Sequence, residues 1–262
     1  MALELYHHPQ STCSQKVRIC LAEKRIPWVG RVVDIARREN LSPEYLAINP
    51  NGVVPALLHD GRAVIESAVM CQYLDELHPR APRLTPADAV ARAAMRAWLC
   101  FIDEVPSMAV RVASFQGVFL PHFQAMSQRE YDDFVSANIL RKIFFRRMGR
   151  GGFNQDEYDG AIEQLELTLE RMERALAGHA WLVSDQFTIA DICMAPLIVR
   201  MEDLGMAGRW ADRAHVQSWY GRMRARPSFA EAFPEGARIS RHKPGLPGGG
   251  EDRGPARAER GG

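Results

Sequence analysis

The chain has 262 residues, of which 47% are hydrophobic and 25% are charged, so it is long enough for two domains with substantial cores. Lys and Arg total 33 against 32 Asp and Glu, and this net charge of +1 argues against a dedicated nucleic-acid binder. No apolar run approaches the ~20 residues of a membrane span, and no secretory signal is evident. We therefore expect a cytoplasmic protein without a membrane partner, and five cysteines without a CxxC pair predict free thiols and no metal site.

The first part of the chain alternates strand and helix signals. The expected elements are a strand at 3–8, a helix at 13–25, a strand at 28–35, a helical turn at 43–48, two short strands around Asp60-Gly61, and a helix at 67–77. The first helix follows from Val17, Cys20 and Leu21, which are apolar at helical spacing. A helix between the first two strands implies a parallel pair, and the hairpin adds an antiparallel edge. The order β-α-β-α-β-β-α predicts an α/β domain over residues 1–80.

The second part of the chain changes to helical patterns alone. Residues 79–86 (PRAPRLTP) hold three prolines and predict an extended linker. An all-α bundle is then expected over residues 87–235. Its helices are predicted at 87–113, 127–148, 156–177, 188–202 and 213–225. Residues 236–262 are rich in Gly, Pro and Arg, so we expect them to form a disordered tail.

Polar residues stand where the first strand meets the first helix, in the order Ser11-Thr12-Cys13. A hydroxyl or thiol there lies beside free backbone N–H groups of a helix N-terminus, where negative charge is favoured. A thiolate would be stabilised at this position. On local sequence alone, however, a plain N-cap is the more frequent use of such residues.

Two further junctions carry residues suited to ligand binding. Pro55 enters a strand from a turn, which makes it a candidate for a cis peptide bond and would leave the Val54 backbone free to pair with an extended peptide ligand. Where the last strand becomes a helix, Glu66 can bind an ammonium group, and Ser67 with its neighbouring N–H groups can hold a carboxylate. An ordinary strand-initiating proline and an ordinary helix cap are the structural alternatives.

One motif is assigned to folding. The segment from Thr188 to Asp191 has the spacing of a capping box at the start of an apolar helix. Its side chains would satisfy the first backbone N–H groups of that helix, so we expect no catalytic role for it.

In their order along the chain, these motifs resemble the cytosolic glutathione S-transferases. The resemblance rests on STCSQKVRICLAEKRI, ENLSPEYLAINPNGVVPALLHDG, IESAVMCQYLDEL, FTIADICMAPL and WYGRMRARPSF, and it covers residues 3–233. It implies a thioredoxin-like N-terminal domain (β-α-β-α-β-β-α) and an all-α C-terminal helical bundle. It also implies glutathione as co-substrate, a small-molecule electrophile and a homodimer.

The resemblance also implies how glutathione is held. Pro55 would be the cis-proline, Val54 would pair through its backbone with the cysteinyl unit, and Glu66 and Ser67 would hold the γ-glutamyl end. In theta-type relatives a histidine contacts the glycyl carboxylate, and this chain has Asn40 at that place. Three other side chains could compensate for the missing histidine: Arg37, Arg38 and Gln72.

Different parts of the chain resemble two different subclasses of this family. The STCS segment resembles SSCS of the zeta-class maleylacetoacetate isomerases, and by that match Ser11 would donate a hydrogen bond to the glutathione sulfur, supported by Thr12 and Cys13. Such a hydrogen bond favours thiolate over thiol and lowers the pKa of bound glutathione. The second half, with a long insertion around 120–155, resembles bacterial beta-etherases that cleave lignin-derived aryl ethers with glutathione.

The electrophile is expected between the two domains. An apolar stripe would line its pocket, formed by Met108, Val112, Phe115, Phe119 and Phe123 with Phe144 and Phe145. Core packing is the alternative role for such a stripe. The segment Arg141–Arg150 has five cations and no acid; it could attract anions or form a solvated basic face.

The sequence therefore predicts an enzyme that activates the glutathione thiolate for attack on a small, hydrophobic, aromatic electrophile, aryl ethers included. Three alternatives stay open. The chain could be an isomerase of the maleylacetoacetate type, a thiol-disulfide reductase that uses Cys13, or a glutathione-binding protein without catalysis.

Overall fold

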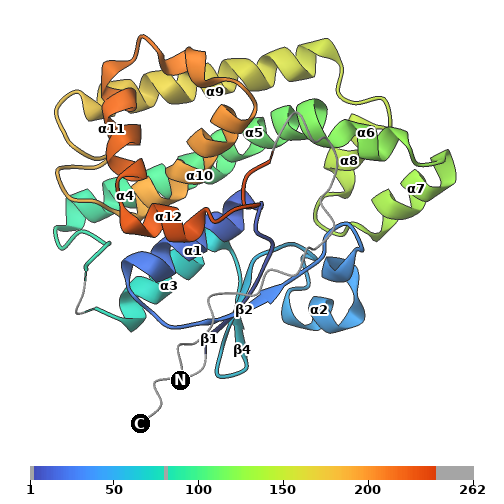
Figure 1. Cartoon of the computed structure of the whole chain (residues 1–262), viewed down its shortest axis with the longest axis horizontal. Helices are drawn as coiled ribbons and strands as arrows, with labels where there is room; N and C mark the ends of the chain where they lie inside the picture. The colour runs from blue at the N-terminus through green and yellow to red at the C-terminus, as the bar shows by residue number, and fades with distance from the viewer. Residues whose placement is uncertain (1–2, 80–81, 240–262) are drawn as a thin grey trace.

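The computed structural model describes residues 3–79 and 82–239. A small sheet with its helices forms one part of the molecule, and a larger helical part lies against it (Figure 1). Both parts agree with the predicted fold class. Almost all of the predicted tail, residues 240–262, lies outside the described residues.

A four-stranded sheet in the order β2-β1-β3-β4 forms the centre of the N-terminal part. Its strands are β1 (Leu3–His7), β2 (Val29–Val32), β3 (Ala56–His59) and β4 (Arg62–Val64). β1 is parallel to β2 and antiparallel to β3, and β3 is antiparallel to β4. A parallel pair needs a crossover, which α1 (Thr12–Glu23) supplies. The turn between β3 and β4 has positive φ at Asp60 and Gly61, as a tight hairpin requires.

The helices of this part complete the predicted order. They are α1, η1 (Glu39–Leu41), α2 (Pro43–Ile48) and α3 (Ser67–Leu77). The apolar stripe of α1 is confirmed, since Val17, Cys20 and Leu21 are fully buried. The second strand is shorter than predicted. The reason is that Asp34 starts a turn, in which its Oδ1 accepts from the backbone N–H of Arg37 at 3.0 Å.

The helical part has no strand within residues 82–239. Its elements are α4 (Ala89–Glu104), α5 (Pro106–Ser114), the π-helical segment η2 (Phe115–Phe119), α6 (Leu120–Gln124), α7 (Gln128–Ala137), α8 (Lys142–Met148), α9 (Gln155–Leu176), α10 (Ile189–Asp203), η3 (Ala207–Trp210), α11 (Ala214–Arg224) and α12 (Pro227–Ala232). Among the described residues, no helix is long and apolar enough to cross a membrane.

Two of the predicted helices are interrupted. The helix expected at 87–113 breaks at Val105, because Pro106 has no backbone N–H to donate to the preceding turn, and α5 then begins at Pro106. The helix expected at 127–148 breaks at Asn138, which has extended backbone and caps α7 by donating from Nδ2 to the carbonyl of Phe134 at 2.8 Å. The short helices α6 and α12 were not predicted.

The two parts meet along α1, which packs against α10 and α12 of the helical part. The buried ammonium of Lys16 on α1 reaches Asp103 on α4 at 2.9 Å. The chain after α12 then returns to α1, where Gln15 donates from Nε2 to the carbonyl of Ala237 at 2.7 Å. Ala237 and Ile239 are buried. The predicted start of the tail at Gly236 is therefore wrong, because residues 236–239 pack on the body of the protein.

Candidate functional site

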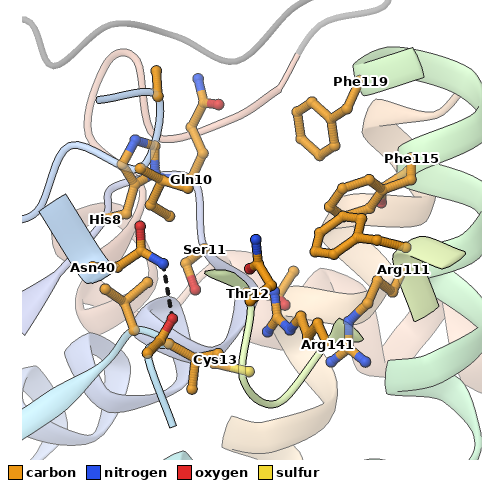
Figure 2. Close-up of a pocket in the computed structure, with 18 of the residues that line it drawn as sticks. His8, Gln10, Ser11, Thr12, Cys13, Asn40, Arg111, Phe115, Phe119 and Arg141 are labelled. Carbon is orange, nitrogen blue, oxygen red and sulfur yellow. Dashed lines mark hydrogen bonds between the residues drawn. The ribbon is translucent and has the colours of Figure 1, made fainter. Parts of the chain in front are cut away.

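A cavity lies between the two parts of the molecule (Figure 2). One side is formed by the loops that follow β1 and β2 and by the turn that precedes β3. The other side is formed by α5, η2, one residue of α6 and the segment from α7 to α8, with one residue from α10. This is where a parallel strand ends and a helix begins, so backbone N–H groups of α1 are available to a ligand.

The three residues predicted at the start of α1 all line the cavity. Ser11 is the N-cap, and its Oγ accepts from the backbone N–H of Ser14 at 3.3 Å. No described residue accepts a hydrogen bond from this hydroxyl. Thr12 and Cys13 form the first turn, are half-buried, and their backbone N–H groups have no partner among the described residues. The cap therefore leaves a hydroxyl hydrogen, a second hydroxyl and two N–H groups for an anionic ligand.

The turn before β3 presents an unpaired piece of backbone to the same cavity. Val54 lines it, and the Val54–Pro55 peptide bond is cis, as the resemblance implies. Within the described chain, the N–H and C=O of Val54 have no hydrogen-bond partner. Asn40 holds this turn in place, since its Nδ2 donates to the carbonyl of Gly52 at 2.8 Å (Figure 2).

Glu66 and Ser67 stand outside the lining of the cavity, at the start of α3. Glu66 has φ 67° and ψ 113°, a backbone conformation that side-chain-bearing residues rarely adopt and that is found at ligand sites. Its Oε1 accepts from Asn51 Nδ2 at 3.4 Å, and the rest of its carboxylate faces solvent. Ser67 is buried at the first position of the helix.

The aromatic stripe forms the wall opposite α1. Phe115, Phe119, Phe123 and Phe145 line the cavity and also pack together, with the rings of Phe115 and Phe119 5.2 Å apart. Phe119, Phe123 and Phe145 are buried and Phe115 is half-buried, so these rings both line the cavity and pack in the core. Phe144 contacts Phe115 but does not reach the cavity.

Two members of the expected stripe lie elsewhere. Met108 is 42% exposed and Val112 is half-buried, and neither lines the cavity. Ser107 and Arg111 take this face of α5 instead. The prediction used hydropathy alone and therefore selected apolar residues. The face of α5 that continues into Phe115 instead carries the hydroxyl of Ser107 and the guanidinium of Arg111, one helical turn apart.

Arginine is prominent at this site, and the sequence analysis singled out Arg38 and the segment that begins at Arg141 but missed Arg111 and Arg200. Four arginines line the cavity: Arg38, Arg111, Arg141 and Arg200. Arg200 is buried on α10 and bonds to the carbonyl of Gln10 and, at 3.3 Å, to Ser114 Oγ. Burial lowers the pKa of Arg200 to about 10. Its bond to Gln10 holds the loop that carries the start of α1.

His7, the last residue of β1, and His8 directly after it are both held neutral. Burial lowers the pKa of His7 to about 3, assisted by the charge of Arg18. Burial also lowers the pKa of His8, which lines the cavity, to about 4. Neither ring supplies a positive charge near neutral pH. No cluster of metal-ligating side chains occurs in the described parts of the chain.

Comparison with known proteins places these features in a family. The sequence-family model of the glutathione S-transferase N-terminal domain matches residues 5–82, and the family model of the C-terminal domain matches residues 134–227. Protein LigF of Sphingobium sp. (strain NBRC 103272 / SYK-6) is 31% identical over 248 residues, which is 91% of this chain and 95% of LigF. The crystal structure of beta-etherase LigF has a TM-score of 0.81 at 30% identity, and the match covers 89% of this chain and 99% of that one.

Two further relatives are similar over most of the chain. A tetrachloro-p-hydroquinone reductive dehalogenase of Sphingobium chlorophenolicum is 27% identical, with 88% of this chain and 95% of its own length covered. A probable maleylacetoacetate isomerase of Vibrio cholerae is also 27% identical, with 90% and 97% covered.

Proposed function

The chain belongs to the glutathione S-transferase family and is a transferase with glutathione as co-substrate, and we propose that it transfers the thiolate to a small aromatic electrophile, aryl ethers included. In such a reaction the sulfur attacks the carbon that bears the aryloxy group. The C–S bond forms as the C–O bond breaks, and the phenolate leaves with the electron pair. This reaction class needs activation of the thiol and a pocket for an aromatic ring.

The unpaired backbone of Val54 is the observation that carries the proposal. An N–H and a C=O facing a cavity can pair with the cysteinyl unit of glutathione as an added strand. Asn40 supports this geometry through its hydrogen bond to Gly52. Glu66 and Ser67 would bind the γ-glutamyl end from outside the cavity mouth, where the unusual backbone of Glu66 aims the start of α3.

Thiol activation is assigned to Ser11. Its oxygen is used as the helix cap, but its hydrogen is available to donate to sulfur. The N-terminus of α1 adds a favourable field for negative charge. If the hydrogen bond lowers the pKa of bound glutathione by two units, it contributes ~2.7 kcal/mol to thiolate formation. Thr12 is the second candidate donor.

The aromatic wall supports an aromatic electrophile. Phe115 and Phe119 present ring faces and edges to the cavity, which suits another aromatic group. The similarity to beta-etherase LigF favours aryl ether cleavage. The similarity to a maleylacetoacetate isomerase keeps isomerisation as the second candidate, and half-buried Cys13 at the cavity keeps a thiol-disulfide reaction as the third.

A substrate panel with glutathione tests the proposal. It contains an aryl ether ketone, a chloronitroaromatic, maleylacetoacetate and a mixed disulfide. Turnover of the ether or the chloroaromatic is expected. Turnover of only the mixed disulfide would assign a reductase, and glutathione binding without any turnover would assign a non-catalytic binding protein.

Three variants separate the candidate donors. Ser11→Ala is expected to raise the pKa of bound glutathione, seen in the ultraviolet absorbance of the thiolate, with little change in glutathione affinity. Thr12→Val and Cys13→Ser should retain the thiolate. If Cys13→Ser abolishes activity and Ser11→Ala does not, the serine mechanism is wrong. A homodimer is a further proposal, tested by light scattering on the purified protein.

A further inference from the structure

The charges that line the cavity are all of one sign. Arg38, Arg111, Arg141 and Arg200 line it, and no Asp or Glu does so within the described residues. Arg200 bonds to the loop before α1, and Arg38 lies over the ring of Phe134 at 5.3 Å. Arg111 and Arg141 lie together on the helical wall, so what this pair of charges could bind needs explanation.

Neither Arg111 nor Arg141 forms an ion pair with any residue that the structure describes. Arg111 donates only to the thioether of Met108 at 2.8 Å and lies 6.0 Å from the ring centre of Phe144. One turn earlier on α5, the hydroxyl of Ser107 is buried at the cavity without a hydrogen-bond partner. A buried donor without an acceptor is unfavourable, which applies to the Ser107 hydroxyl. In the described chain, the guanidinium of Arg141 has no acceptor, and that of Arg111 has only the Met108 thioether.

The electrostatics agree with that geometry. Burial lowers the pKa of Arg111, and burial together with the charge of Arg111 lowers the pKa of Arg141 to about 9. Two desolvated cations side by side repel each other. An anion between them would relieve the repulsion and accept charge-assisted hydrogen bonds from both.

We propose that Ser107, Arg111 and Arg141 form a carboxylate subsite for the electrophile, so that aromatic acids are preferred over neutral aromatics of the same shape. The inference rests on the proposed function and names its substrate class. Arg111 precedes Phe115 by one turn of the same wall, so an acidic group on a ring stacked near Phe115 would lie within reach of the guanidinium. Figure 2 shows Arg111 and Arg141 together below Phe115, across the cavity from Ser11.

Glutathione is a second source of the same chemistry, because it carries two carboxylates of its own. The carboxylate of Glu66 raises the pKa of Arg141, so the predicted γ-glutamyl end would lie within electrostatic reach of that guanidinium. Arg111 and Ser107 belong to the opposite, helical wall. The test must therefore separate a carboxylate on the electrophile from those on glutathione.

The test measures binding rather than turnover. Two aryl conjugates of glutathione are compared by calorimetry, one with a carboxylate on the ring and one with the carboxamide in its place. Glutathione itself is measured in parallel. The native protein is expected to bind the acid about tenfold more tightly than the amide, the size of one charge-assisted hydrogen bond. Arg111→Gln and Arg141→Gln should remove most of that preference, and Arg111→Gln should leave glutathione affinity unchanged within about twofold.

Arg129→Gln is the matched control, because Arg129 is an exposed arginine on α7 outside the cavity, and it should keep the preference. Arg111→Lys should retain part of it, and it serves if the glutamine variant does not fold. Equal binding of acid and amide by the native protein would overturn the subsite. A loss of glutathione affinity in Arg111→Gln as large as its loss of affinity for the acid conjugate would also overturn it, by assigning Arg111 to glutathione. Failure of the native protein to bind glutathione or either conjugate would instead refute the proposed function.

Discussion

Neutralising one buried carboxylate near the start of α10, that of Asp191, is expected to cause a large loss of stability. Asp191 is fully buried, and its Oδ1 accepts from Leu182 N at 2.9 Å and from Trp219 Nε1 at 2.9 Å. Its Oδ2 accepts from the backbone N–H of Thr188 at 3.0 Å and from its hydroxyl at 3.1 Å. Burial raises the pKa of this carboxyl, and these four donors oppose the shift. Both oxygens are thus fully used in joining a loop, α10 and α11.

The magnitude follows from what asparagine would leave unmade. Asp191→Asn keeps one acceptor for Leu182 and Trp219 but turns an NH₂ group toward the N–H of Thr188. Two buried donors then face each other without an acceptor, and each such group costs about 1–3 kcal/mol. We expect the free energy of unfolding to fall by about 3 kcal/mol, which lowers Tm by about 6–12 °C for a chain of this size.

Urea denaturation of the variant and the native protein measures this difference. Asp185→Asn is the matched control, because Asp185 lies in the same loop and accepts only one exposed backbone hydrogen bond, from Ala180 N at 2.9 Å. That control should lose no more than about 1 kcal/mol. If the two variants are equally stable, the reasoning from buried acceptors is wrong.

Two further predictions concern pH and the C-terminal segment. Because the pKa values of His7 and His8 are lowered to about 3 and about 4, the unfolded chain takes up two more protons than the folded one as pH falls below 6.5. The free energy of unfolding should therefore drop by about 2 kcal/mol from pH 6 to pH 5. The His8→Asn variant should show about half of that drop. A urea denaturation midpoint that stays constant over this pH range would contradict the prediction. Truncation after Ile239 should preserve glutathione affinity. Truncation after Glu235 removes the carbonyls to which Gln10 donates and should weaken that affinity. Equal glutathione affinities of the two truncated proteins in a titration would contradict this role of residues 236–239.

The order of the elements could be predicted because each depends on local signals. The stripe of α1, the hairpin at Asp60-Gly61 and the capping box of α10 are patterns within a few residues. The break at Val105 is equally local and was missed only because the apolar period continues through it. The packing of Ala237 could not be predicted, because its partner Gln15 is 222 positions away.

The two sides of the site differ in the same way. One side is formed at junctions of strand, turn and helix, where Ser11, Thr12, Cys13 and Val54 lie. Such junctions can be predicted from local sequence patterns. Arg111 lies on α5, and Arg141 lies between α7 and α8. Nothing local relates these two positions, and only the folding of α7 and α8 back toward α5 brings them together.

Whether a capping side chain can also bind a ligand depends on how many of its hydrogen-bond donors and acceptors remain without a partner in the protein. Ser11 accepts one hydrogen bond as a cap and keeps a hydrogen to donate, so capping and thiol activation are compatible. Asn40 uses one amide N–H on Gly52 and keeps its oxygen and a second N–H. Asp191 has both oxygens occupied by four donors, so it has no capacity for a ligand. Two capping motifs therefore differ in their remaining capacity: the one at Asp191 has none, and the one at Ser11 keeps the donor that the proposed thiol activation needs.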